Sequence, residues 1–229
     1  MQKILKNILL FITEISFILI FWVSIIILTV VLFEYLGEKI YFFIHRDKTE
    51  VKQEKIIYDV LRVYPEGEFN IKKHGGFETG SLEGWGASGE AFASQPTYED
   101  NPFFRGIPLS TNIAGDYWIG TYEQRPNKES LRGETQGDVL IGTLTSGEFI
   151  VTKSKISFLI GGGKGANTRV EFLIDNKIVL YRTGHNSETL RRVYCDVSQY
   201  IGQKARLCIV DYSKGHWGHI NVDDFRIED

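Results

Sequence analysis

The stretch that decides the fold reads ISFLIGGGKGANTRVEFLIDNKIVL and spans residues 156–180. Within it, apolar side chains occupy alternate positions in two runs: Ile156, Phe158 and Ile160, then Val170, Phe172 and Ile174. A period of two puts one face of each run on a core, so both runs are predicted strands. Asp175-Asn176 tolerates the positive φ of a tight hairpin turn, which predicts that the strands on either side of this pair are antiparallel neighbours.

The sequence around this stretch shows the same pattern. Ala205, Leu207 and Ile209 also alternate with other residues, so they predict a further half-buried strand. The chain contains 23 glycines and 13% aromatic residues, a combination expected of short strands and tight turns around an aromatic-rich core. We therefore predict an all-β sandwich with a jelly-roll-like layout.

Length and charge narrow the possible partners. The chain has 229 residues, which allows one membrane segment and one domain of ordinary size. Its formal net charge is -3, without a dense Lys/Arg block. Because nucleic-acid phosphates require a concentrated positive surface, we expect no nucleic-acid partner.

The two cysteines, Cys195 and Cys208, have too few His and Cys neighbours at ligand spacing for a structural zinc site. They fall in consecutive predicted strands, and an oxidising compartment would permit a disulfide between them. Two free thiols in the core are the alternative. The sequence leaves both possibilities open.

An apolar run near the N-terminus predicts a membrane anchor. Residues 15–33 contain no charged side chain and are bounded by Glu14 and Glu34. At about 1.5 Å per residue the run nearly covers a bilayer core of about 30 Å. We predict an N-terminal tail at 1–14 and a transmembrane helix at 15–34, in contact with the lipid bilayer. No small-residue cleavage site follows the run, which favours a retained anchor over a cleaved signal peptide.

Two further segments follow the predicted anchor. From Tyr35 to about Arg62, apolar residues at helical spacing are mixed with charges, and no Gly or Pro follows Gly37. We predict a partly helical juxtamembrane stalk over 35–65. From Glu66 onward glycines recur every few residues, so the β domain is predicted to span 66–229.

Several motifs of the predicted β domain occur in one order and spacing. They are Tyr117-Trp118-Ile119-Gly120-Thr121-Tyr122, Gly142-Thr143-Leu144-Thr145-Ser146, Phe158-Leu159-Ile160-Gly161-Gly162-Gly163, Phe172-Leu173-Ile174-Asp175, Thr183-Gly184-His185-Asn186-Ser187-Glu188, Cys195-Asp196-Val197-Ser198 and Trp217-Gly218-His219-Ile220-Asn221-Val222-Asp223. As a set, over residues 74–229, they resemble the family 66 carbohydrate-binding modules found beside the catalytic domain of bacterial levanases and related family 32 glycoside hydrolases.

This resemblance implies a β-sandwich that binds the terminal fructose of a fructan and catalyses no reaction. The chain departs from the family pattern at Cys195, where an aromatic residue is usual, and in having a predicted anchor in place of a hydrolase. The catalytic propeller of the family 32 enzymes does not fit into 229 residues. We therefore expect no enzymatic activity.

Candidate ligand-binding residues come from three predicted loops: Tyr122, Glu123 and Arg125; Asn167 and Arg169; and Trp217 and His219. A sugar is held by aromatic faces against its C–H patches and by fixed donors and acceptors for its hydroxyls. The three loops are predicted to converge on one site. The alternatives are that Trp217 packs on the core, that His219 satisfies a loop carbonyl, and that the charged residues form surface ion pairs.

Two other motifs bear on possible phosphate and metal sites. Gly161-Gly162-Gly163-Lys164-Gly165 does not match a phosphate loop, because glycine follows the lysine where Ser or Thr is required; its glycines are predicted to let the backbone turn sharply beside Trp217. Glu78 and Asp224 resemble the structural calcium site of many jelly-roll modules, where the first and last strands meet. Exposed acids at strand ends are the alternative.

The sequence thus predicts a membrane-anchored, non-catalytic module that binds fructose-containing or other surface glycans. The alternative is a membrane-tethered protein-interaction or sensor sandwich with a protein partner; a hydrolase is ranked last, because no motif pairs an acid with a base. The charges flanking the predicted anchor place the C-terminal domain in the cytoplasm. Because large domains cross membranes with little regard to such charges, and a sugar-binding module is useful mainly outside, we expect a single-pass protein with an extracytoplasmic C-terminal domain.

Overall fold

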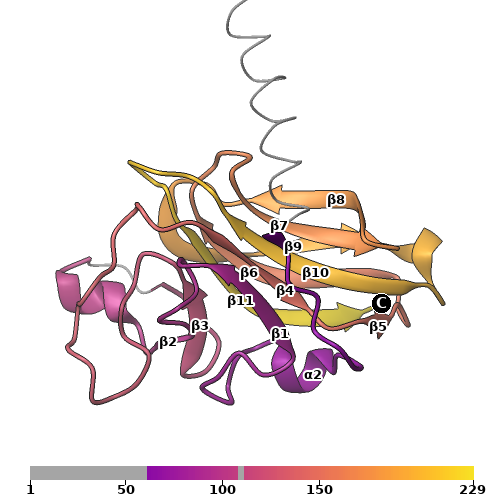
Figure 1. The fold of residues 1–229 in the computed structure, drawn as a ribbon, viewed down its shortest axis with the longest axis horizontal. Coiled ribbons are helices and arrows are strands. Elements are labelled where there is room, and N and C mark those ends of the chain that lie inside the picture. Colours follow the sequence, from indigo (N-terminus) through magenta and orange to yellow (C-terminus); the bar gives the residue numbers. More distant parts are fainter. Residues whose placement is uncertain (1–60, 108–110) are drawn as a thin grey trace, which may run out of the picture. The chain divides into compact units, whose positions relative to one another are not determined.

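The computed structural model describes residues 61–107 and 111–229, which form two antiparallel sheets (Figure 1). The first sheet has the order β1 (Trp85–Gly89), β4 (Gly142–Ser146), β10 (Lys204–Asp211), β7 (Thr168–Ile174) and β8 (Lys177–Thr183), with β5 (Phe149–Ile150) also paired to β10. The second has the order β2 (Thr97–Tyr98), β3 (Tyr117–Gly120), β11 (Ile220–Glu228), β6 (Lys155–Gly162) and β9 (Ser187–Asp196). The helices within the described residues are α2 (Ile71–His74), η1 (Asn101–Arg105) and η2 (Ser198–Tyr200).

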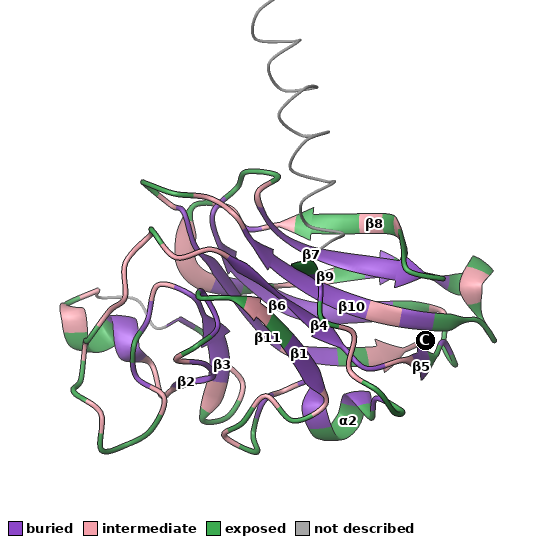
Figure 2. Ribbon diagram, in the orientation of Figure 1, coloured by how far each residue is buried: buried purple, intermediate pink, exposed green. Residues whose placement is uncertain are grey.

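The core lies between the two sheets. Phe158 of the second sheet and Phe172 of the first belong to one buried apolar cluster, and the ring of Trp85 lies 5.7 Å from that of Phe225, which joins the sheets. Figure 2 shows β7 and β10 buried, whereas β8 is largely exposed at the sheet edge. The predicted two-sheet β-sandwich is confirmed.

The hairpin predicted at Asp175-Asn176 is also present. β7 and β8 pair antiparallel, with Ile174 opposite Lys177. Asp175 and Asn176 have φ of 48° and 60°, the positive values that a two-residue hairpin turn of this hand requires. The local turn chemistry therefore sets the register of this edge strand.

The two cysteines are free and buried. Cys195 points into the main core, whereas Cys208 lies on the outer face of the first sheet beside Leu173 and Val210. The two belong to different sheets and face different clusters, which excludes the disulfide alternative and leaves two free thiols. Burial raises the pKa of the Cys208 thiol to about 12, so this thiol stays protonated and unreactive.

The predicted single-pass membrane localisation is corrected here. Within residues 61–107 and 111–229, no helix is long and apolar enough to cross a bilayer. The predicted tail at 1–14, the predicted span at 15–34 and most of the predicted stalk at 35–65 lie outside the described residues. The extracytoplasmic placement of the C-terminal domain depended on that span and is withdrawn with it.

The folded domain includes residues before Glu66. Arg62 donates to Glu171 at 2.6 Å, and both side chains are fully buried. Arg206 donates to the carbonyl of Pro65 at 3.3 Å, and a Cβ at Gly86 would lie 2.5 Å from the carbonyl of Val63. Residues 62–65, which we call the strap, are therefore packed against the first sheet.

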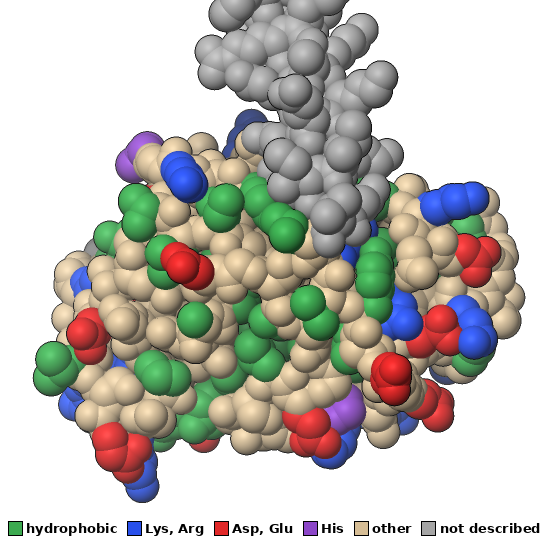
Figure 3. Space-filling model, in the orientation of Figure 1, with side chains coloured by type: hydrophobic (Ala, Val, Ile, Leu, Met, Phe, Trp, Pro, Cys, Tyr) green, Lys and Arg blue, Asp and Glu red, His purple; other side chains and the backbone are tan. Residues whose placement is uncertain are grey.

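On the face of the molecule drawn in Figure 3, Lys and Arg side chains are interspersed with Asp and Glu rather than gathered by sign. This distribution agrees with the formal net charge of -3.

The buried ion pair gives a prediction about stability. Replacing Arg62 by Ala leaves the Glu171 carboxylate buried with Arg169 as its remaining cation, so unfolding should become easier by about 3 kcal/mol. Lys204→Ala is the matched control, because Lys204 pairs with Glu148 at the exposed surface and its loss should cost less than about 1 kcal/mol. Urea unfolding measures both, and equal losses would contradict the structural role of the strap.

A candidate ligand-binding site at one end of the sandwich

Strand ends from both sheets meet at one end of the sandwich. In the second sheet, Gly162 at the end of β6 pairs with Ile220 at the start of β11 and with Ser187 at the start of β9. In the first sheet, β10 ends at Asp211, opposite the start of β7. These strand ends, the helix η1 and the neighbouring loops together carry a polar cluster formed by Asn101, Arg105, Tyr122, Glu123, Asp138, Glu188, Asp211, Trp217, His219 and Asn221.

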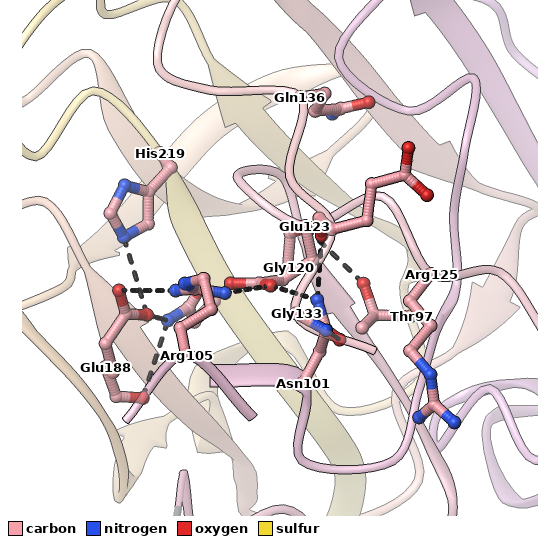
Figure 4. Close-up of polar contacts among 12 residues, drawn as sticks. Thr97, Asn101, Arg105, Gly120, Glu123, Arg125, Gly133, Gln136, Glu188 and His219 are labelled. Carbon is pink, nitrogen blue, oxygen red and sulfur yellow. Dashed lines mark hydrogen bonds and ion pairs between the residues drawn. The ribbon is translucent and has the colours of Figure 1, made fainter. Parts of the chain in front are cut away.

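Glu123 contacts Arg105 and Asn101 within this polar cluster (Figure 4). Its side chain is fully buried, and Oε2 accepts hydrogen bonds from Asn101 Nδ2 at 2.6 Å and from Arg105. Burial raises the pKa of Glu123 to about 7, against the opposing effect of Arg105 and Asn101. The carboxyl group therefore changes protonation near neutral pH.

Arg105, at the end of η1, joins three parts of the cluster. One guanidinium nitrogen binds Glu123, and another lies 3.5 Å from Glu188 Oε1. The guanidinium carbon lies 5.0 Å from the centre of the Tyr122 ring, a cation–π contact. The short helix η1 thus places one cation between two carboxylates and against an aromatic face.

His219 lies between the carboxylates of Asp138 and Glu188. Its Nδ1 is 2.7 Å from Asp138 Oδ1, and its Nε2 is 3.7 Å from Glu188 Oε2. Burial alone lowers the pKa of His219, but Asp138 and Glu188 outweigh burial and raise it to about 9. The ring is therefore an imidazolium at neutral pH. It holds Asp138 and Glu188 in position on its two sides.

Aromatic rings flank this imidazolium. The Tyr122 and Trp217 rings lie 5.3 and 5.4 Å from that of His219. Trp217 has a φ of 58°, unusual for a non-glycine residue. A Cβ on Gly163 would collide with the carbonyl of Trp217, which explains why glycine follows β6 where the Trp217 loop approaches it.

Asp211 is a second buried acid of the cluster. It is 1% exposed, and neither of its carboxylate oxygens makes a hydrogen bond of ordinary geometry. Burial raises its pKa to about 7, although Thr121 and the backbone of Ser213 oppose this. Glu123 Oε1 and Asn221 Oδ1 are likewise buried acceptors without a donor. Such atoms are rare in folded proteins and call for a partner such as water or a ligand.

Four of the seven predicted ligand-binding residues lie in the cluster: Tyr122, Glu123, Trp217 and His219. Arg125 points away from it (Figure 4) and donates to the carbonyl of Tyr98 and to Glu99. Arg169 lies on β7 and binds Glu171, and the backbone carbonyl of Asn167 accepts from Tyr212. The structure therefore brings two of the three predicted loops together through their side chains.

Six cluster residues were not predicted: Asn101, Arg105, Asp138, Glu188, Asp211 and Asn221. Glu188 and Asn221 fall within the motifs that carry the family resemblance, so those motifs could have indicated them. Asp211 lies two residues after Ile209 in the alternating run of β10, and that spacing also points it inward. Arg105 and Asp138 lie outside any periodic pattern.

The predicted calcium ligands already have partners in the protein. Glu78 accepts from the backbone N–H groups of Asp116 and Tyr117 at 3.0 and 3.2 Å, and Asp224 pairs with Arg192 and Arg226. Among the residues that the structure describes, no group of three or more His, Cys, Asp or Glu side chains is placed to hold a metal. The calcium prediction gains no support from these contacts and stays a prediction.

Comparisons with known proteins give partial likenesses. No family model matches the chain. One relative is ecdE of Aspergillus rugulosus, provisionally named a glycosyl hydrolase, which is 30% identical over 149 residues, or 65% of this chain. The chain spans 19% of the length of that relative.

Solved structures give weaker likenesses. A family 61 carbohydrate-binding module in complex with β-1,4-galactotriose is 18% identical, with a TM-score of 0.42 over 67% of this chain and 93% of that one. A family 6 carbohydrate-binding module is 17% identical, with a TM-score of 0.30 over 49% and 73%. A cleaved adhesin domain of Lys-gingipain from Porphyromonas gingivalis is 10% identical, with a TM-score of 0.39 over 66% and 93%. These TM-scores are too low to assign a family or a ligand, so membership of family 66 stays a prediction.

The buried ionisable groups predict how stability changes with pH. The folded-state pKa values of Glu123, Asp211 and Asp223, about 7, 7 and 8, exceed the ordinary values of 4.5, 3.8 and 3.8, and that of His219, about 9, exceeds 6.5. Between the ordinary and the raised values the folded chain holds a proton that the unfolded chain has lost. Stability should therefore fall as pH rises from about 5 to about 9.

Thermal unfolding between pH 4 and pH 9 measures this fall. Asp211→Asn removes one of the contributing groups, so its unfolding temperature should decline less between pH 5 and pH 8 than that of the wild type. Asp175→Asn, in the exposed hairpin turn, is the matched control and should follow the wild type. A wild-type unfolding temperature that rises steadily up to pH 8 would contradict the assignment.

Proposed function

We propose that the β-sandwich is a non-catalytic carbohydrate-binding module and that the polar cluster at the end of the sandwich is its sugar site. The observation that carries this proposal is the placement of two partly exposed aromatic rings, Tyr122 and Trp217, on a buried imidazolium whose two sides hold Asp138 and Glu188. The family 66 resemblance adds the finer proposal that the sugar contains fructose, as in a fructan.

The chemistry of these groups suits a sugar. Aromatic faces pack against the C–H patches of a pyranose or furanose ring, and carboxylates accept hydrogen bonds from its hydroxyls. Asp138, Glu188 and Arg105 are fixed by ion pairs with one another or with His219. Because these side chains are already ordered, binding a ligand costs less conformational entropy than it would if they were mobile.

The relative from Aspergillus rugulosus agrees with this proposal. The region shared with this chain makes up 19% of a protein named for glycosyl hydrolysis. A sugar-binding module in such a protein would hold the glycan while another part acts on it. For this chain the sugar and the role remain part of the proposal.

A second candidate function, glycoside hydrolysis, has one observation in its favour. Burial raises the pKa of Glu123 to about 7. Burial also acts to raise the pKa of Glu188, but His219, Asn221 and Arg105 outweigh it and hold that pKa below its ordinary value. A protonated and an ionised carboxyl group are what an acid–base pair requires. Against this reading, Glu123 is fully buried and its Oε2 is taken by Asn101 and Arg105, so we rank binding first.

Titration of the purified full chain with levan, inulin and free fructose, together with a glycan array, tests the binding proposal. Trp217→Ala and Tyr122→Ala should each weaken glycan binding at least about tenfold, because each removes a stacking face. Tyr194→Ala is the matched control, since Tyr194 is an exposed tyrosine elsewhere on β9, and it should bind like the wild type. A folded chain that binds no glycan would contradict the proposal and favour a protein-interaction or sensor sandwich.

Hydrolysis is tested on the same polysaccharides. We expect no release of reducing sugar from levan or inulin by the full chain over the range pH 5 to pH 8. Release that Glu123→Gln abolishes, while Glu148→Gln at the exposed surface leaves it intact, would instead establish the hydrolase candidate.

A further inference from the structure

The charged side chains of the cluster differ in how far they reach solvent. The carboxylates of Asp138 and Glu188 are 18% and 12% exposed, whereas the imidazole between them is 5% exposed. An approaching ligand therefore meets the two acceptors before it meets the cation that holds them. Arg105 is also 18% exposed, so the polar surface beside the rings of Tyr122 and Trp217 consists of these two carboxylates and the guanidinium that lies against Tyr122.

The cations of the cluster are already engaged. Arg105 directs one guanidinium nitrogen to Glu123 and another toward Glu188. Both ring nitrogens of His219 face carboxylates. A carboxylate on a ligand would have to compete with these internal partners for either cation.

The buried atoms without hydrogen bonds also indicate a ligand that donates hydrogen bonds. In the described part of the cluster they are four oxygens, namely both oxygens of Asp211, Oε1 of Glu123 and Oδ1 of Asn221, and one nitrogen, Nε2 of His219, which is a donor in the imidazolium. These oxygens of Asp211 and Glu123 are acceptors without donors when those carboxyl groups are ionised. Buried acceptors need donors, supplied by a ligand directly or through bridging water. Asp211 is 1% exposed and lies near His219 and Asp138, so its unmet acceptors belong to the same end of the sandwich.

We infer that this site selects sugars presenting hydroxyl or amino donors and discriminates against sugars that carry a carboxylate, such as uronic and sialic acids. The inference rests on the proposed function and names the ligand class of the same site. A ligand carboxylate would lie beside Asp138 and Glu188 and would be repelled at short range. A hydroxyl or an ammonium at the same place donates to both.

The test uses pairs of array glycans that are identical except for a terminal glucose or glucuronate, or galactose or galacturonate. For the wild-type full chain, the neutral member of each pair that binds should bind at least about tenfold more tightly than the acidic member. Asp138→Asn and Glu188→Gln keep the shape of each side chain but remove its charge. Each should reduce this ratio, whereas Glu148→Gln at the exposed surface should leave it unchanged.

The outcomes separate the inference from the proposed function. If no glycan binds, the proposed function fails and the inference falls with it. If neutral and acidic partners bind the wild type equally well, the inference is overturned while the sugar-binding proposal survives. A wild-type preference that neither Asp138→Asn nor Glu188→Gln alters would overturn the assignment of selectivity to these carboxylates; if a variant does not fold, the wild-type ratio still decides.

Discussion

The alternation of inward and outward side chains along the strands is the constraint on which the structure depends. It builds the core from both sheets, and it also determines where the polar cluster lies. On β10 the inward series runs through Ile209 and reaches Asp211 at the strand end, and on β7 it runs from Val170 back to Thr168. The inward-facing side of each of these strands therefore carries apolar residues along most of its length and polar residues at one end. The candidate site is a continuation of the core, which accounts for the burial of its acids.

Burial and charge together give this end of the sandwich its chemistry. An isolated buried carboxylate is costly, so such groups are protonated or paired. Both solutions occur here: Asp211 has a pKa raised by burial to about 7, whereas Asp138 and Glu188 share the imidazolium of His219. Pairing with His219 fixes two hydrogen-bond acceptors, Asp138 and Glu188, near the surface. The buried acids with raised pKa values determine how much stability the fold loses as pH rises. The arrangement that would hold a ligand is thus also the one that weakens the fold toward alkaline pH.

Much of the fold could be predicted from the sequence, because the period of two and the Asp175-Asn176 turn are local signals. The site was predicted less completely for a geometric reason. Arg169 precedes the inward Val170 by one residue, so the same period that located the strand already placed Arg169 on the outer face, beside Glu171. Arg105 and Asp138 reach the cluster from irregular segments. No spacing in the sequence specifies such a meeting, which arises only when the loops fold.

A comparison within the molecule supports reading the cluster as a ligand site rather than as structural polarity. At the strap, the buried Glu171 has both carboxylate oxygens bound, one by Arg62 and the other by Arg169. Both acceptor oxygens of Glu171 therefore have donors, as expected where the role is to hold a segment in place. At the polar cluster, the equally buried Asn221 retains an acceptor without a donor, and Asp211 does so when its carboxyl group is ionised. Since the chain satisfies a buried carboxylate fully at one place, the surplus of acceptors at the other indicates that donors come from outside the chain.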